Sequence, residues 1–215
     1  MSATEFPKPF PVQFSGSLAV GWLLKRLGWR VKFEGLPTRQ GVLTIYPHTS
    51  NWDFVILVLA KWTIGIPVRF WGKDRLFRVP VLGHWLRWLG GLPVDRTAAR
   101  GVVSQAVDQF AQSCAQDCYF WLVLAPEGTR KRIPGWRSGF YHTARKAGVP
   151  VGLVRLDYRL REVRVLDFMR LTGDEIKDFR RIARIYDGVT GYHPQNAAPI
   201  RLLEPSVLRT ETVVK

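Results

Sequence analysis

The sequence predicts a single-domain α/β sandwich with a mixed, mostly parallel sheet and flanking helices. The chain has 215 residues, of which 47% are hydrophobic, and this is enough for one well-buried core. Apolar, β-branched runs alternate with segments of helical periodicity, as they do in folds built on parallel sheets. The turn "RLRE" (159–162) between two strand-like segments predicts one antiparallel hairpin near the end of the chain.

Residues 1–40 are expected to form an N-terminal segment that contains a basic amphipathic helix over residues 15–29. Leu18, Trp22 and Leu27 supply its apolar side, and Lys25 and Arg26 supply its charge. Two interpretations stay open for this helix. It either packs on the domain or lies in a membrane interface.

Residues 41–187 are expected to form the core. Ser50 or Asn51 is placed to cap a helix that begins at Trp52, and Thr172 with Glu175 predicts a capping box for the last helix, which has Ile176 on its apolar side. Residues 188–215 are expected to be a tail that packs on the core or trails from it. The remaining expected elements are the strands "GVLTIYP" (41–47), "LPVD" (92–95), "CYFWLVLA" (118–125), "VPVGLVRLDYRL" (149–160) and "EVRVLDF" (162–168), and helices over about 79–89 and 139–148.

The composition predicts a basic surface. Lys and Arg number 32 against 17 Asp and Glu, a net charge of +15, which attracts nucleic acid, anionic lipid headgroups or phosphorylated substrates. Nine Trp favour the membrane interface, where indole rings and basic side chains both find partners. An anionic membrane surface is therefore the expected partner, and nucleic acid is not.

The N-terminus lacks the charged-then-apolar order of a secretory signal, so we expect a cytoplasmic protein. The longest apolar runs of the chain, "LAVGWLL" and "FVILVLA", fall short of the roughly 20 residues that a spanning helix needs. This predicts peripheral attachment to the cytoplasmic face of the membrane. Cys114 and Cys118 have no metal-ligand spacing, so neither a disulfide framework nor a metal site is expected.

The stretch "YPHTSNWDF" (46–54) places His48 five residues before Asp53, between two apolar runs. A neutral imidazole can remove a proton from an attacking alcohol, while a carboxylate orients the ring and stabilises the imidazolium that forms. Ser50 is an alternative nucleophile, although the chain contains no GxSxG elbow. Taken alone, the spacing is a weak signal and favours a structural pair.

A second polar turn, "PEGTRKR" (126–132), follows a buried strand directly. Gly128 allows close backbone approach to a ligand, Thr129 can donate to phosphate oxygens, and Arg130 offers a planar fork. The alternative is a solvated basic turn, which accounts for Lys131 and Arg132 but not for Glu127 or Gly128. The turn therefore predicts a site for a phosphate-bearing substrate.

Together these residues resemble the lysophospholipid acyltransferases of the 1-acylglycerol-3-phosphate acyltransferase type. That family's two signatures are a histidine, four intervening residues and an aspartate, and a Pro-Glu-Gly-Thr-Arg turn. Similarity covers roughly residues 41–154, including the block at 72–96 with Lys73 and Arg96. The chain departs from the family pattern at Pro47, Ala125 and Leu153, which leaves the acceptor headgroup open.

The resemblance implies a glycerol-3-phosphate-acyltransferase-like sandwich and transfer of an acyl group from acyl-CoA or acyl carrier protein to a lysophospholipid hydroxyl, with no other cofactor. His48 would act as the base and Asp53 would orient it. Glu127 is interpreted as an organiser that pairs with a cation or holds a backbone amide. The residues expected to hold the acceptor are Lys73, Arg96, Glu127, Gly128, Thr129 and Arg130.

Competing hypotheses follow from the same observations. A different lyso-lipid could be the acceptor, and a lipid thioesterase or hydrolase could use the same base on water. A non-catalytic basic protein that binds membranes or nucleic acid would leave the His48 and Asp53 pair without a role.

Overall fold

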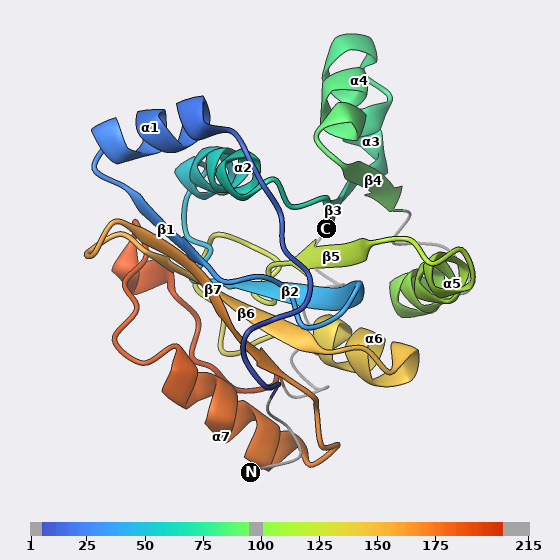
Figure 1. Ribbon diagram of the computed structural model, residues 1–215. Helices are drawn as coiled ribbons and strands as arrows, with labels where there is room; N and C mark the ends of the chain where they lie inside the picture. Colours follow the sequence, from blue (N-terminus) through green and yellow to red (C-terminus); the bar gives the residue numbers. More distant parts are fainter. Residues whose placement is uncertain (1–5, 95–100, 204–215) are drawn as a thin grey trace.

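The computed structural model describes residues 6–94 and 101–203, and within them one seven-stranded sheet has the order β1-β7-β6-β2-β5-β3-β4 (Figure 1). The strands are β1 Arg30–Phe33, β2 Gln40–Tyr46, β3 Val68–Lys73, β4 Gly91–Val94, β5 Phe120–Leu124, β6 Val151–Asp157 and β7 Glu162–Met169. The helices are α1 Leu18–Arg26, α2 Trp52–Ile64, α3 Asp74–Phe77, α4 Pro80–Trp88, α5 Gly101–Ala115, α6 Gly139–Ala147 and α7 Glu175–Ile185, and η1 Pro194–Asn196 is a 3-10 turn.

The strands pair in parallel except at the β6–β7 hairpin, which is antiparallel. The side chain of Asp157 closes the hairpin turn by accepting hydrogen bonds from the backbone amides of Arg159 and Leu160. The expected fold class, a mixed and mostly parallel α/β sandwich with one late hairpin, is confirmed.

Helices cover both faces of the sheet. On one face, α1 and α2 bury Leu24 and Ile56 against the sheet together with Trp121. On the other face, α5, α6 and α7 bury Phe110, Phe140 and Ile182. The short helices α3 and α4 stand at the β3–β4 end of the sheet (Figure 1).

Both flanking segments contact the sheet. Strand β1, within the expected N-terminal segment, pairs with β7 at the sheet edge. Residues 188–203 return across the carboxyl end of the central strands, where the Tyr158 amide donates to the Thr190 carbonyl and the Tyr46 hydroxyl donates to the Ala198 carbonyl.

The expected capping box of the last helix is wrong. Asp174 is the N-cap of α7, and its carboxylate accepts a hydrogen bond from the Lys177 amide. The Thr172 hydroxyl instead donates to the buried carboxylate of Asp178, which offers a charged acceptor in place of a helix amide. Ile176, expected on the apolar face, is exposed.

Candidate active site

The carboxyl ends of the parallel strands β2, β5 and β6 bring the predicted catalytic turns together. His48 follows β2, Glu127 follows β5 and Tyr158 follows β6. Because β5 and β6 flank β2 in parallel, all three residues lie at the same edge of the sheet. This topology explains how residues about 80 and 110 positions apart in the chain form one site.

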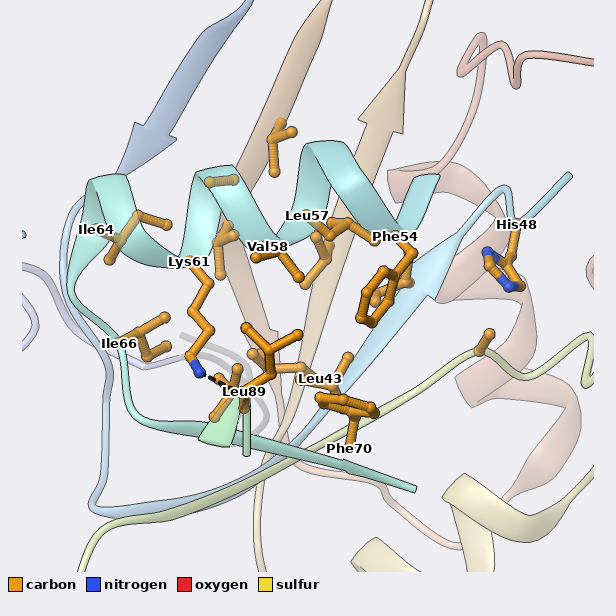
Figure 2. A pocket seen from close by; sticks show the side chains of 18 of the residues that line it. Leu43, His48, Phe54, Leu57, Val58, Lys61, Ile64, Ile66, Phe70 and Leu89 are labelled. Carbon is orange, nitrogen blue, oxygen red and sulfur yellow. Dashed lines mark hydrogen bonds between the residues drawn. The ribbon is translucent and has the colours of Figure 1, made fainter. Parts of the chain in front are cut away.

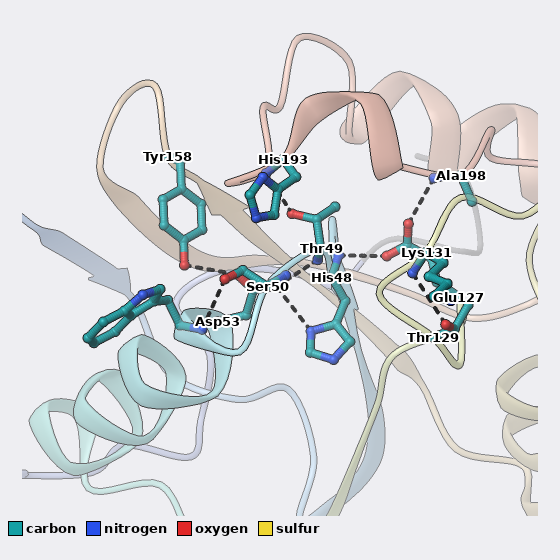
Figure 3. Close-up of polar contacts among 11 residues, drawn as sticks. His48, Thr49, Ser50, Asp53, Glu127, Thr129, Lys131, Tyr158, His193 and Ala198 are labelled. Atoms are coloured by element: carbon teal, nitrogen blue, oxygen red, sulfur yellow. Dashed lines mark hydrogen bonds and ion pairs between the residues drawn. The ribbon is translucent and has the colours of Figure 1, made fainter.

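His48 and Asp53 are in contact (Figure 3). The imidazole Nδ1 lies 3.2 Å from Asp53 Oδ2. The two atoms are close enough for an ion pair, but they do not form a well-aligned hydrogen bond. Catalytic contacts of this kind often shorten when a substrate binds. Nδ1 is buried against Asp53 while the side chain as a whole is 22% exposed, so Nε2 is the nitrogen available to a substrate.

Asp53 is fully buried in the first turn of α2 and accepts several hydrogen bonds. Its Oδ2 accepts from the backbone amides of Thr49 (2.7 Å) and Ser50 (2.9 Å), and its Oδ1 accepts from the Tyr158 hydroxyl (2.8 Å). Burial by itself would raise the pKa of Asp53, but contacts with His48, the Ser50 amide and the Tyr158 hydroxyl outweigh it and hold that pKa below its usual value. The carboxylate therefore stays ionised beside the imidazole.

Tyr158 supplies the hydrogen bond to Asp53 from the end of β6. Its ring packs edge-on against Trp29 and Tyr192, which hold the hydroxyl in place. Burial, together with the neighbouring Asp53 carboxylate, raises the pKa of Tyr158, so the phenol remains protonated and donates.

Glu127 joins three segments of the site through its two carboxyl oxygens. Oε2 accepts from the His48 amide (2.5 Å), and Oε1 accepts from the Ala198 amide (2.9 Å). Burial raises the pKa of Glu127 to about 7, even though both amides oppose the shift. The Glu127 carboxyl group therefore binds two backbone amides, which agrees with its interpretation as an organiser that holds an amide.

The rest of the turn after β5 is open to a ligand. Gly128 has a φ of +64°, and a Cβ there would lie 2.9 Å from Arg137 Cδ, so this position favours glycine. The Thr129 hydroxyl accepts from the Lys131 amide, and Arg130 is exposed. Arg137 lies over the turn and is tied to it because its own amide donates to the Pro126 carbonyl.

The other residues predicted from sequence have different positions. Lys73 ends β3, one strand beyond β5 on the same edge of the sheet, and Arg96 lies outside the described residues. Ser50 is buried, and its hydroxyl accepts from the Trp52 amide at the start of α2. Asn51, the other predicted cap, is the N-cap of α2 and makes no side-chain capping hydrogen bond. The contact of Ser50 with the Trp52 amide disfavours Ser50 as a nucleophile.

An apolar cavity of about 230 Å³ runs from His48 between α2 and the sheet (Figure 2). Phe54 and Phe70 form part of its wall, and Ile64 and Ile66 lie at the end far from His48. At that inner part the Lys61 ammonium donates to the Leu89 carbonyl at 2.6 Å. Burial, and secondarily Arg69, lowers the pKa of Lys61.

A second hollow adjoins the first, since Trp71 and Ala125 line both. Its lining includes Gly128, Arg137 and the start of α6 at Gly139. One hollow is therefore mostly apolar, with the Lys61 ammonium at its inner part, and its neighbour contains a guanidinium beside the glycine turn. The two together suit a molecule with a hydrocarbon part and an anionic part.

Sequence reasoning missed Tyr158, Ala198 and Arg137. Tyr158 and Ala198 reach the site only through the β6 crossover and the returning tail, so no local pattern marks them. Arg137 had a signal, because it precedes a predicted helix at its amino end and follows the glycine turn closely.

In the part of the chain that the structure describes, no group of three or more His, Cys, Asp or Glu side chains is arranged to hold a metal ion. Cys114 and Cys118 are exposed free thiols. The described helices include none with the length and apolar character needed to span a bilayer.

The fold and this site define an α/β protein with a His–Asp pair at the mouth of an apolar cavity. The family model described as Acyltransferase matches residues 30–154, which is more than half of the chain. The chain therefore belongs to the acyltransferase family, and the resemblance seen in the sequence motifs is confirmed at that level.

Two relatives illustrate the similarity. The chain is 24% identical over 132 residues to 1-acyl-sn-glycerol-3-phosphate acyltransferase LPAT1, chloroplastic, from Arabidopsis thaliana, which covers 57% of this chain and 35% of the relative. It thus spans about a third of that relative's length. Its fold is similar to that of PlsC, a 1-acyl-sn-glycerophosphate acyltransferase from Thermotoga maritima, with a TM-score of 0.51, 18% identity, and coverage of 78% of this chain and 75% of that one.

Proposed function

We propose that the chain is an O-acyltransferase that moves a fatty acyl group from an acyl thioester to the free hydroxyl of a lysophospholipid, with 1-acylglycerol-3-phosphate as the first acceptor to test. The observation that carries this proposal is the contact between His48 and the ionised Asp53 carboxylate at the mouth of an apolar cavity. The family membership and the names of both relatives support it.

The reaction uses His48 as the base. Nε2 removes the proton of the acceptor hydroxyl as that oxygen attacks the thioester carbonyl, and Asp53 stabilises the imidazolium. The new oxygen–carbon bond forms, the carbon–sulfur bond breaks, and the departing thiolate takes the proton back from the imidazolium. The base is regenerated, and the products are the acylated lipid and a free thiol.

The two hollows divide the substrates between them. The apolar cavity behind His48 receives an acyl chain, because its walls are mostly hydrocarbon. The hollow at Gly128 and Arg137 receives the acceptor's phosphate, with Arg130 on the same turn and Lys73 at the end of β3. The donor is acyl-CoA or acyl carrier protein, and no further cofactor takes part.

The setting of the reaction is the cytoplasmic face of an anionic membrane. A lysophospholipid lies in a bilayer with its headgroup at the water boundary, so the enzyme must dock there. The net charge of +15 attracts anionic headgroups, and high salt should therefore weaken docking. Nucleic acid is not required as a partner.

The decisive experiment measures free-thiol release from a long-chain acyl-CoA across a panel of lysophospholipids, with a no-acceptor control and the variant His48→Ala. Lysolipid-dependent release that falls by at least 10²- to 10⁴-fold in the variant is the expected result. Release without an acceptor would indicate a thioesterase. If neither acyl-CoA nor acyl carrier protein supports release, the proposal is wrong.

Arg130→Ala tests the assignment of the two substrates. Loss of a phosphate contact should raise the apparent KM for a phosphorylated acceptor more than the KM for the thioester. If only the donor KM rises, the two substrate positions are reversed.

A further inference from the structure

Exposed large apolar side chains are concentrated on helices α1 and α4. Leu18 and Trp22 of α1 are 90% and 62% exposed, and Val81 and Trp88 of α4 are 84% and 68% exposed. Single exposed apolar residues are ordinary on a soluble surface, but such a concentration on neighbouring helices marks an interaction site.

Helix α1 packs on α2, and α4 reaches α2 through aromatic side chains. Figure 1 shows α1, α2 and α4 on the same side of the molecule. On the α1 side, the Ser17 amide donates to the Trp62 carbonyl. On the α4 side, the rings of Trp85 and Phe54 lie 6.2 Å apart, and those of Trp88 and Trp62 lie 5.6 Å apart. Val81 projects beyond these contacts.

The charges on this face indicate what kind of partner binds it. Segments 18–26 and 74–88 contain five cations and one carboxylate, Asp74. A second copy of this chain would bring like charges together, whereas an anionic bilayer offers both hydrocarbon for Val81 and Trp88 and phosphates for the cations. The cations are Lys25, Arg26, Arg75, Arg78 and Arg87.

This face also adjoins the apolar cavity. Phe54, which contacts Trp85 of α4, lines the cavity beside Phe70. Leu89, directly after α4, lines it as well. A bilayer that receives α4 would therefore lie next to the wall of the cavity that starts at His48.

We infer that helix α4 is a membrane-docking element that inserts Val81 and Trp88 into the boundary between headgroups and acyl chains of an anionic bilayer. The role that we assign to this docking, delivery of lipid to the His48 site, rests on the proposed function. The insertion itself is measurable without turnover.

The first test places an environment-sensitive nitrobenzoxadiazole label at Val81→Cys in a Cys114→Ser, Cys118→Ser background. The matched control is Ile176→Cys, a 72% exposed apolar position on α7 at the opposite face of the sheet. Vesicles of phosphatidylcholine with phosphatidylglycerol should shift the Val81 label to shorter wavelength and leave the Ile176 label unchanged. Equal responses at both positions, no response at Val81, or an equal shift with phosphatidylcholine alone would overturn the inference.

The second test compares Val81→Glu with Ile176→Glu. Val81→Glu removes the valine surface that the bilayer buries, and this should weaken binding to the anionic vesicles, measured by flotation, about tenfold. Ile176→Glu should leave the binding unchanged. Transfer to vesicle-embedded lysolipid should fall with it, while transfer to a water-soluble short-chain lysolipid stays unchanged. Unaltered flotation of Val81→Glu contradicts α4 docking, whereas absence of transfer to either acceptor in the parent protein contradicts the proposed function alone.

Discussion

Replacing Asp53 by asparagine separates the charge of this residue from its hydrogen bonds. An asparagine oxygen in place of Oδ2 can still accept from the Thr49 and Ser50 amides, and its NH₂ group can donate to the Tyr158 hydroxyl, which is able to reverse its role. The loop should therefore stay folded, at a cost of about 1–2 kcal/mol in the free energy of unfolding. What disappears is the charge 3.2 Å from the His48 ring.

The lost charge sets the size of the effect on catalysis. A carboxylate 3.2 Å from an imidazolium contributes about 5 kcal/mol at an effective dielectric constant of about 20. If all of it stabilises the transition state, Asp53→Asn lowers kcat roughly 10³- to 10⁴-fold. Lysolipid-dependent thiol release measures the rate, and urea unfolding measures the stability.

Asp178 provides the matched control. It is also buried, and it accepts from the Thr172 and Gly173 amides and from the Tyr141 hydroxyl, but it belongs to the first turn of α7 on the other face of the sheet. Asp178→Asn should lose a similar amount of stability and keep its kcat. A kcat for Asp53→Asn within tenfold of the parent value would refute the assigned role of the charge.

Three further predictions concern the surroundings of the pair. Tyr158→Phe removes the donor to Asp53 Oδ1, so the pKa of Asp53 should rise and the acidic limb of the pH–rate profile should move to higher pH; an unmoved limb would show that the hydroxyl does not act through Asp53. Because burial raises the pKa of Glu127 from 4.5 to about 7, the folded state holds that proton more tightly, and the free energy of unfolding should fall as pH rises from about 5 to 8, by up to about 3 kcal/mol. Urea unfolding across this range should show the fall in the parent and not in Glu127→Gln, and identical slopes would contradict the buried-proton assignment. Ala125→Phe should fill the junction of the two hollows and shift preference toward shorter acyl thioesters in a competition assay; an unchanged preference in a folded variant would exclude the cavity as the acyl site.

The central strands and the hairpin could be predicted from sequence because they are buried. Their side chains are apolar with little interruption, as in β2 and β6. Strands β1 and β3 and helix α5 were missed. The β1 sequence "RVKF" alternates exposed and half-buried residues at the sheet edge, and β3 carries Arg69 and Lys73. Helix α5 mixes small and apolar residues with polar ones, and Ala106 and Phe110 are its buried residues.

The sequence by itself determined the elements of the site that are local. A strand followed at once by a helix places His48 within reach of Asp53, and a glycine turn after a strand marks Gly128, because both depend on a few consecutive residues. Tertiary structure alone decided what surrounds them. Tyr158 reaches Asp53 across 105 residues and Ala198 reaches Glu127 across 71, since only the pairing of parallel strands and the return of the tail bring these groups within hydrogen-bond distance.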